Sequence, residues 1–173
     1  MRALLVGVLA VAVSGCGADR PAPPADAGPA TIAVTSSAFT DGASIPEQFT
    51  CRGAGTAPPL AWTGAPPSAA ALALVVVDPD AHDYYHWIAL DLPAASTSLD
   101  GPAAHEARNS KGTTGWTPPC PPSGRHRYRF TVYALDAETG LATGAGTVEA
   151  LDAIEEHAVA HGTLTGVVSA SSG

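Results

Sequence analysis

Four side chains that could bind an anion or exchange a proton stand at the ends of predicted strands: Asp78, His86, His126 and Tyr128. A protonated imidazole and a phenol hydroxyl both donate hydrogen bonds to phosphate oxygens. Asp78 would repel an anion unless it holds a histidine protonated or carries a proton itself. If these side chains converge, they form a small pocket that suits an anion.

Each of these residues also has a purely structural interpretation. A histidine at a strand end is often a hydrogen-bonded surface group, and Asp78 and Asp80, on either side of Pro79, are common turn residues. A tyrosine such as Tyr128 often lies at the rim of a core. Convergence of all four is what favours a binding site.

Three predicted strands must position these groups: residues 71–77, 86–92 and 127–136. The first is a nearly continuous apolar run, typical of a strand buried on both faces. Alternate side chains along a strand share a face. Each polar group is therefore predicted to lie at the end of a row of apolar side chains on the same face of its strand. The rows are Leu74-Val76-Asp78, His86-Ile88-Leu90-Leu92 and His126-Tyr128-Phe130-Val132.

The remaining patterns indicate the fold class. Residues 31–36 and 163–169 are further strand candidates, and Val148–His161 has helical spacing with Gly162 as a stop. Pro- and Gly-rich turns separate the runs. We therefore predict a mainly β protein, an antiparallel β-sandwich with one or two peripheral helices.

The first 30 residues are predicted to lie outside this fold. Residues 1–15 combine Arg2 with an apolar run that is too short to span a bilayer, as in a signal peptide. The run ends at Cys16 in a sequence similar to a bacterial lipobox, which predicts lipidation of that cysteine and a membrane-anchored protein of the cell envelope. The alternative is an ordinary secretory signal that contains a cysteine. Residues 16–30 are rich in Pro and Ala and are predicted to form a tether, with the domain at 31–173.

Two further cysteines, Cys51 and Cys120, follow within the predicted domain. In an oxidising compartment this pair favours a disulfide, and two unpaired thiols are the alternative. The 8 Lys and Arg residues against 16 Asp and Glu give a formal net charge of −8. This balance argues against nucleic acid as a partner.

Two motifs resemble the signatures of the phosphatidylethanolamine-binding proteins: Asp78-Pro79-Asp80-Ala81 with His86-Trp87, and Pro121-Pro122-Ser123-Gly124-Arg125-His126-Arg127-Tyr128. Flanking stretches such as Phe49-Thr50-Cys51 look like the bacterial Raf-kinase-inhibitor-like branch. The resemblance implies a β-sandwich with a pocket for phosphate or a phospholipid head group. It implies a ligand-binding set of Asp78, Pro79, Asp80, His86, Pro121, His126 and Tyr128, in which Asp80 also supports its loop, and no cofactor, metal or catalytic residue. Arg127 is assigned to an ion pair or the surface.

The sequence departs from the family pattern in two places. The loop from Ala81 to Tyr85 is short and aromatic, which is expected to change one pocket wall. Pro118 has no backbone N–H, so one contact to an anion is expected to be missing.

Two other functions compete with the binding module. An exposed aromatic patch of Tyr84, Tyr85 and Trp116 would favour a protein-interaction or inhibitor module whose partner the sequence does not name. A metal site at the Asp and His residues, or a histidine base near Ser123, would favour an enzyme. Against an enzyme, no His-x-His or Gly-x-Ser-x-Gly spacing is present. For a binding module, anion affinity is expected to rise as the pH falls through about 6.5.

Overall fold

The structure is a computed structural model, and it describes residues 32–171. The predicted signal peptide at 1–15, the lipidation site Cys16 and the tether at 16–30 lie outside the described residues. Within the part of the chain that the structure describes, no helix has the length and apolar character needed to cross a membrane.

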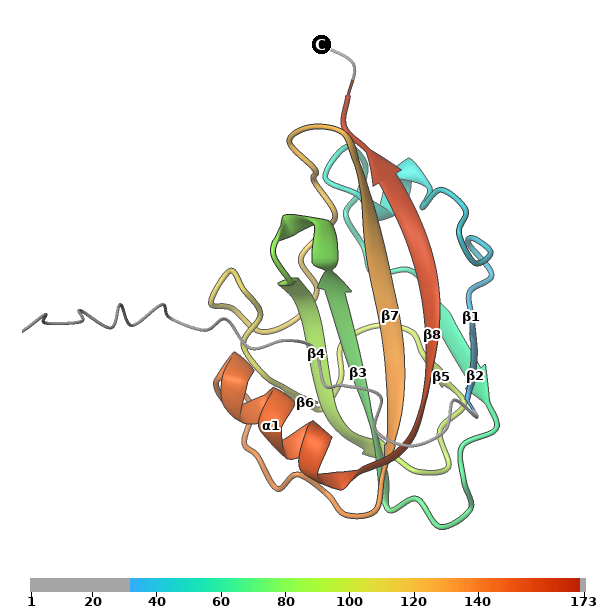
Figure 1. Ribbon diagram of the computed structural model, residues 1–173, viewed down its shortest axis with the longest axis vertical. Helices are drawn as coiled ribbons and strands as arrows, with labels where there is room; N and C mark the ends of the chain where they lie inside the picture. The colour runs from blue at the N-terminus through green and yellow to red at the C-terminus, as the bar shows by residue number, and fades with distance from the viewer. Residues whose placement is uncertain (1–31, 172–173) are drawn as a thin grey trace, which may run out of the picture.

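Two antiparallel sheets face each other (Figure 1). The larger sheet has the strand order β6-β4-β3-β7-β8, and the smaller has the order β1-β2-β5. One helix, α1 (Thr147–His157), lies against the outer side of the larger sheet. The larger sheet consists of β3 (Ala71–Asp78), β4 (Tyr84–Pro93), β6 (His105–Glu106), β7 (Arg125–Leu135) and β8 (Ala158–Ser169), and the smaller of β1 (Ala33–Thr35), β2 (Leu60–Thr63) and β5 (Ser98–Leu99). The predicted sandwich with a peripheral helix is confirmed.

The larger sheet is buried on both faces, because the smaller sheet packs on one face and α1 packs on the other. Between the sheets, one apolar cluster includes Trp62, Leu74 and Phe130. On the other face, Ile88 and Leu90 pack with Ile154 of α1. Every residue of β3 is buried, as its continuous apolar run predicts.

The predicted helix Val148–His161 is wrong at its C-terminal end. The helix ends at His157, and residues 158–161 begin β8, which pairs with the whole length of β7. Gly162 is therefore a strand residue rather than a helix stop. A Cβ at Gly162 would collide with the Ile32 carbonyl, so glycine permits the N-terminal strand region to approach β8 closely. Strand pairing over 158–162 outweighs the local helical spacing.

Two irregularities in the β3–β4 pairing change which side chains of β4 share a face. The register shifts between Leu72 and Leu74 and again between Val76 and Val77. Ile88 and Leu90 therefore face α1, whereas Leu92 faces the inter-sheet core. The predicted row His86-Ile88-Leu90-Leu92 is wrong, because a β-bulge interrupts the alternation on which it was based.

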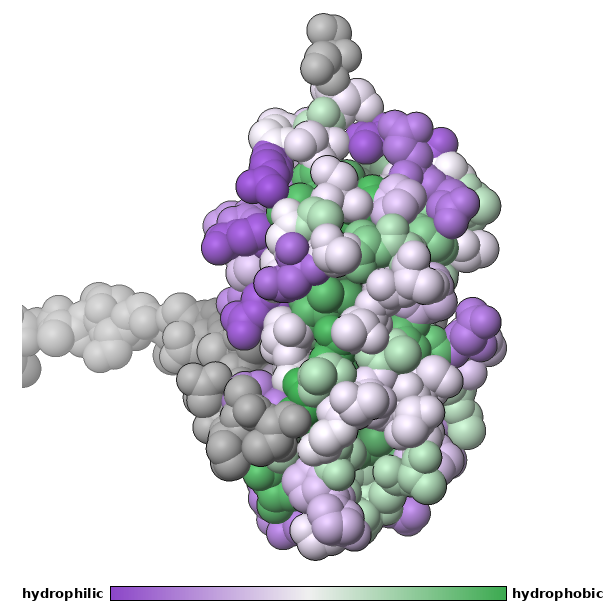
Figure 2. Space-filling view, turned by 90° about the vertical axis from the view of Figure 1, so that its right-hand side faces the viewer, coloured by the Kyte–Doolittle hydropathy of each residue, from purple (hydrophilic) through white to green (hydrophobic). Residues whose placement is uncertain are grey.

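The surface is uneven in polarity (Figure 2). On the face drawn there, the most hydrophilic residues lie mainly in the upper half of the molecule, while the lower half is paler or green. The upper half is the end at which β3 finishes and β7 begins. The candidate site lies at these strand ends.

Candidate functional site

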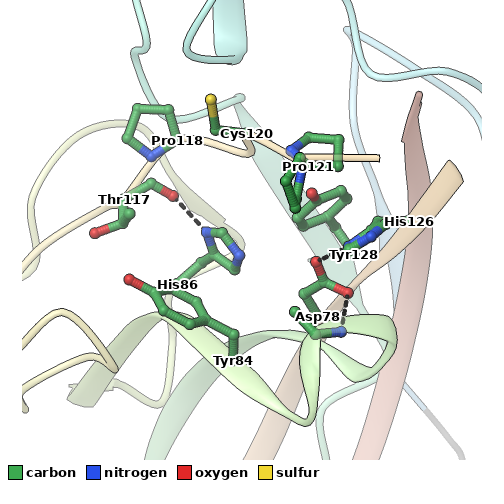
Figure 3. A pocket seen from close by; sticks show the side chains of 11 residues that line it. Asp78, Tyr84, His86, Thr117, Pro118, Cys120, Pro121, His126 and Tyr128 are labelled. Atoms are coloured by element: carbon green, nitrogen blue, oxygen red, sulfur yellow. Dashed lines mark hydrogen bonds and ion pairs between the residues drawn. The ribbon is translucent and has the colours of Figure 1, made fainter. Parts of the chain in front are cut away.

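A cavity of about 310 Å³ lies where β3 ends, β4 and β7 begin, and residues 117–122 cross above them (Figure 3). Three of its polar side chains come from three neighbouring strands: Asp78 from β3, His86 from β4 and His126 from β7. Antiparallel pairing on both sides of β3 brings these ends together. The full lining is Asp78, Ala81, Tyr84, His86, Thr117, Pro118, Cys120, Pro121, Pro122, His126 and Tyr128.

Asp78 organises the cavity floor. Its Oδ1 accepts hydrogen bonds from the backbone N–H groups of Asp80 (2.9 Å) and Ala81 (3.2 Å), which caps the 3₁₀ turn Pro79–Ala81. Its Oδ2 lies 2.7 Å from Nδ1 of His126. Asp78 is only 2% exposed, and these donors compensate for burying the carboxylate. A carboxylate oxygen here accepts, so Nδ1 of His126 donates and Nε2 is the ring nitrogen left for a ligand.

His86 is held in one tautomer by the loop above it. Its Nδ1 lies 2.7 Å from the Thr117 carbonyl oxygen, which can only accept, so Nδ1 carries the hydrogen. Figure 3 shows the other ring nitrogen turned away from Thr117, toward the space between the lining side chains. Burial lowers the pKa of His86 below its ordinary value of 6.5, although Thr117 and the charge of Asp78 oppose this shift. Near neutral pH, Nε2 of His86 is therefore an acceptor.

Tyr128 completes the apolar side of the floor. Burial first, and then the charge and hydrogen bonding of Asp78, raise the pKa of its hydroxyl well above 10. The phenol therefore stays protonated over the physiological range. Its ring meets that of His86 edge-on, with 5.1 Å between the ring centroids.

The structure brings five of the seven predicted ligand-binding residues to the cavity: Asp78, His86, Pro121, His126 and Tyr128. Pro79 and Asp80 are not among its lining residues. Pro79 instead opens the 3₁₀ turn behind Asp78. Whether the five bind a ligand remains a prediction.

Asp80 fastens that turn to β7 through Arg127. Its Oδ2 accepts from the backbone N–H of Arg127 (2.8 Å) and from Nε (3.0 Å), and its Oδ1 accepts from Nη2 (2.7 Å). The guanidinium lowers the pKa of Asp80 to about 2, mainly through these side-chain hydrogen bonds. The predicted supporting role of Asp80 and the predicted ion pair of Arg127 agree with this geometry.

Six lining residues were absent from the predicted ligand-binding set: Ala81, Tyr84, Thr117, Pro118, Cys120 and Pro122. The short loop does place Tyr84 in a cavity wall, in agreement with the expected change there. His82 and Asp83 both have positive φ, which turns the chain back within two residues. No signal in the sequence identified Thr117, because its role depends on a carbonyl meeting His86 across 31 positions.

The disulfide prediction is confirmed: Cys51 and Cys120 are bonded, with their Cα atoms 5.4 Å apart. The backbone N–H of Cys51 also donates to the Pro119 carbonyl (3.0 Å). These two links tie the loop over the cavity to the segment after the 3₁₀ turn Glu47–Phe49. Cys120 therefore contributes to the lining as half of a cross-link.

Tyr84, Tyr85 and Trp116 do not form the exposed aromatic patch that would favour a protein-interaction module. Tyr85 is only 2% exposed and packs on the α1 side of the sheet, because the β-bulge separates it from Tyr84. Trp116 packs against the inter-sheet core and stacks on Phe130. For residues 32–171, the structure contains no group of three or more His, Cys, Asp or Glu side chains placed to hold a metal ion.

Comparisons with known proteins agree with this architecture. The family model described as Phosphatidylethanolamine-binding protein matches residues 35–169. The chain is 47% identical over 157 residues to "Putative lipoprotein LppC" of Mycobacterium tuberculosis, covering 86% of this chain and 76% of that protein. It is 40% identical over 141 residues to a UPF0098 protein of Methanothermobacter thermautotrophicus, covering 75% of this chain and 93% of the relative.

Two solved structures share the fold. A phosphatidylethanolamine-binding protein homologue of Chlamydia trachomatis, CT736, superposes with a TM-score of 0.77 at 32% identity, covering 82% of this chain and 99% of that one. YbcL of E. coli superposes with a TM-score of 0.76 at 26% identity, covering 82% and 100%. The chain belongs to the phosphatidylethanolamine-binding protein family.

Proposed function

We propose that this chain is an exported, lipid-anchored binding protein whose cavity takes a small phosphate-bearing anion, either free phosphate or the phosphate of a lipid head group. The observation that carries the proposal is the pairing of Asp78 with His126 on the cavity floor. Oδ2 of Asp78 lies 2.7 Å from Nδ1 of His126, which fixes the orientation of the imidazole ring and leaves its Nε2 unused. The contact places an oriented imidazole beside the space that an anion would occupy.

Two groups are placed to donate to such an anion. Nε2 of His126 is not used by the bond to Asp78, and it donates when both ring nitrogens carry a hydrogen. Residues 118–122 contain four prolines, so the N–H of Cys120 is the single backbone donor of this stretch. The disulfide fixes Cys120, which lines the cavity. Pro118 also lines the cavity but has no N–H to offer, in keeping with the expected missing contact.

His86 sets which protonation state of the ligand fits. With Nδ1 donating to Thr117 and a lowered pKa, its Nε2 accepts a hydrogen bond at neutral pH. A phosphate that retains one P–O–H group can donate to that nitrogen, whereas a fully ionised phosphate cannot. At lower pH, His86 gains a proton and becomes a second cationic donor. Affinity should therefore rise as the pH falls, in a range below 6.5 rather than centred on it.

A titration with inorganic phosphate and phosphoethanolamine, followed by the NMR signals of the histidine rings, tests the proposal. We expect saturable shifts of His86 and His126, with weaker binding in His126→Gln. The matched control His105→Gln replaces an exposed histidine outside the cavity and should bind like the parent protein. A phosphate affinity that changes neither in His126→Gln nor with pH would rule out this cavity as the anion site.

The membrane anchor is supported by the lipobox-like sequence ending at Cys16 and by the lipoprotein name of the Mycobacterium tuberculosis relative. Incorporation of labelled palmitate into the exported protein tests it. We expect label in the parent protein and none in Cys16→Ser. Equal labelling of both would show that Cys16 is not the attachment point.

We also propose that the cavity binds its ligand without catalysing a reaction on it. Among the residues of the described domain that line the cavity there is no serine, and the one cysteine is in the disulfide, so this part of the chain places no free Ser or Cys nucleophile at the site. Incubation with a chromogenic phosphomonoester should release no product above the rate of the His86→Gln variant. Hydrolysis that the variant abolishes would instead establish an enzyme.

A further inference from the structure

A second cavity, of about 360 Å³, lies on the other side of the segment that covers the first. Trp116 lines this second cavity, whereas the next two residues, Thr117 and Pro118, line the first. The second cavity is formed by Gly55, Thr56, Ala57, Trp87, Gly101, Pro102, Glu106, Gly115 and Trp116. The proposed anion site uses none of these residues.

Of the described residues in this lining, Glu106 is the only ionisable one. It belongs to the short strand β6 and is only 7% exposed. Its Oε1 accepts hydrogen bonds from Nε1 of Trp87 (2.9 Å) and from the backbone N–H of Ala103 (3.1 Å). These two donors fix the orientation of the carboxyl group in the cavity wall.

The second oxygen of Glu106 lacks a partner. Among residues 32–171, no donor bonds to Oε2, and no Lys, Arg or His nitrogen lies within 4.0 Å of the carboxyl group. Oε2 is not one of the enclosed side-chain atoms without a partner in residues 32–171, so it can be reached from the cavity. A carboxylate oxygen that is reachable but has no protein donor attracts a cation. A half-satisfied carboxyl at a cavity wall therefore points to a cation that comes from outside the chain.

Two indole rings supply the apolar part of the same cavity. The rings of Trp87 and Trp116 meet edge-on, with 6.2 Å between their centroids and 70° between their planes. The rings of Phe130 and His86 also lie near the Trp116 ring, with centroids 6.0 and 6.2 Å away, and Trp116 still contributes to the cavity lining. The negative face of an indole attracts organic cations, and tryptophan does so more strongly than other aromatic residues.

Gly115 keeps the approach to the carboxyl group open. It has φ +84°, and a Cβ at this position would lie 3.6 Å from Oε2 of Glu106. A larger side chain here would cover the oxygen that has no donor. Gly55 and Gly101, also at positive φ, contribute further rim positions without side chains.

We propose that this second cavity binds a small organic ammonium group, with the charged nitrogen against Oε2 of Glu106 and its carbon substituents against the indole of Trp116. One carboxyl oxygen and two indoles suit an alkylammonium better than Mg²⁺ or Ca²⁺, which take six or more oxygen ligands. An anion is disfavoured, because Glu106 would repel it. The inference is independent of the proposed anion site.

Titration of the full chain with choline chloride, at constant ionic strength, tests the proposal. The signals to follow are the indole N–H resonances of the three tryptophans, Trp62, Trp87 and Trp116. We expect saturable shifts for Trp87 and Trp116. Trp62 is an internal reference, because its Nε1 donates to the Ser96 carbonyl (2.7 Å) and it does not line the cavity. The neutral analogue 3,3-dimethylbutan-1-ol, which has the shape of choline without its charge, should bind at least roughly tenfold more weakly.

Glu106→Gln keeps an oxygen for Trp87 and Ala103 and removes only the charge. It should lower choline affinity roughly tenfold, whereas Glu155→Gln, which removes an exposed charge of α1, should not. If Glu106→Gln does not fold, two other measurements test the site. Trp116→Leu should weaken choline binding, and the neutral analogue should bind the parent protein more weakly than choline does.

The absence of saturable shifts across the millimolar range, or equal affinity for choline and its neutral analogue, would overturn the proposal. Equal choline affinity in folded Glu106→Gln and the parent protein would do the same. Parallel phosphate titrations separate the two sites. Glu106→Gln should leave phosphate binding unchanged, and His126→Gln should leave choline binding unchanged.

Discussion

Nδ1 of His126 lies 2.7 Å from Oδ2 of Asp78, although 47 residues separate them in the chain. The antiparallel pairing of β3 with β7 creates this contact, because it places the end of one strand beside the start of the other. The same carboxyl group caps the 3₁₀ turn that follows β3. Asp78 therefore links the backbone of the turn to the chemistry of the cavity.

Replacing Asp78 with Asn tests this double role. Asn retains an oxygen that can cap the turn but loses the charge that interacts with His126. We expect the free energy of unfolding, measured in urea, to fall by about 1–3 kcal/mol. We also expect phosphate affinity to fall, because the single side-chain oxygen of Asn caps the turn and its NH₂ group then faces Nδ1 of His126 in place of an acceptor. Asp152→Asn, which removes an exposed charge of α1, is the control. Tighter phosphate binding in Asp78→Asn would mean that Asp78 acts mainly by repelling the ligand.

The lowered pKa of His86 predicts how stability depends on pH. Burial places the pKa in the folded protein below 6.5, so the unfolded state binds more protons in the interval between the two values. The contribution of His86 is therefore fully present above about 6.5 and decreases as the pH falls toward the folded-state pKa. The difference in the free energy of unfolding between the parent protein and His86→Gln, measured from pH 8 to about 5, should follow this direction. A contribution that increases on acidification would contradict the burial of a neutral imidazole.

The ion pair of Asp80 with Arg127 predicts a specific titration. Arg127→Gln should raise the pKa of Asp80 from about 2 toward its ordinary value of 3.8, as followed by the ¹³C signal of the carboxyl group. The stability that Asp80 contributes is present above 3.8 and is lost as the pH falls through about 2, because acid protonates the carboxylate. Arg125→Gln removes a nearby exposed arginine and should leave this pKa unchanged. If Arg127→Gln and Arg125→Gln raise the pKa of Asp80 equally, the overall positive charge lowers that pKa, and the direct contact with Arg127 does not.

Removing the disulfide should affect both stability and the cavity. The Cys51–Cys120 bond closes a separation of 69 residues, and its loss should cost about 2–5 kcal/mol of unfolding free energy. Because Cys120 lines the anion cavity, the double variant Cys51→Ser with Cys120→Ser should also bind phosphate more weakly. Stability follows from urea unfolding, and affinity from the NMR titration at a temperature where the variant is folded. Unchanged affinity in the folded variant would show that the loop keeps its position without the cross-link.

Some of the site could be predicted because its pattern is local. On β7 the alternation is regular, so His126, Tyr128 and Phe130 do share a face, and the apolar run of β3 is buried on both sides as expected. The chemistry of Asp78, His86 and His126 is evident from their types and from the two motifs. The disulfide was the favoured interpretation of a pair of cysteines in a chain whose first residues predict export.

Other features depend on contacts that no local pattern contains. The β-bulge opposite Val76 and Val77 places His86 in the cavity and Tyr85 under α1, against simple alternation. The change from helix to strand at Ala158 is decided by pairing with Leu135 of β7. The orientation of the His86 ring depends on the Thr117 carbonyl, and Glu106 becomes a buried carboxyl only beside Trp87.

The sequence by itself therefore determined the family, the sandwich and the chemical groups available for binding, and it favoured a bond between Cys51 and Cys120. Local alternation and residue type are sufficient for these, because each depends on neighbours in the chain or on composition. Only the tertiary structure decided which groups face which cavity, which nitrogen of His86 is free, and that a second cavity holds a half-satisfied carboxyl. Those properties arise from strand register and loop placement, which are set by the free energy of packing the whole domain.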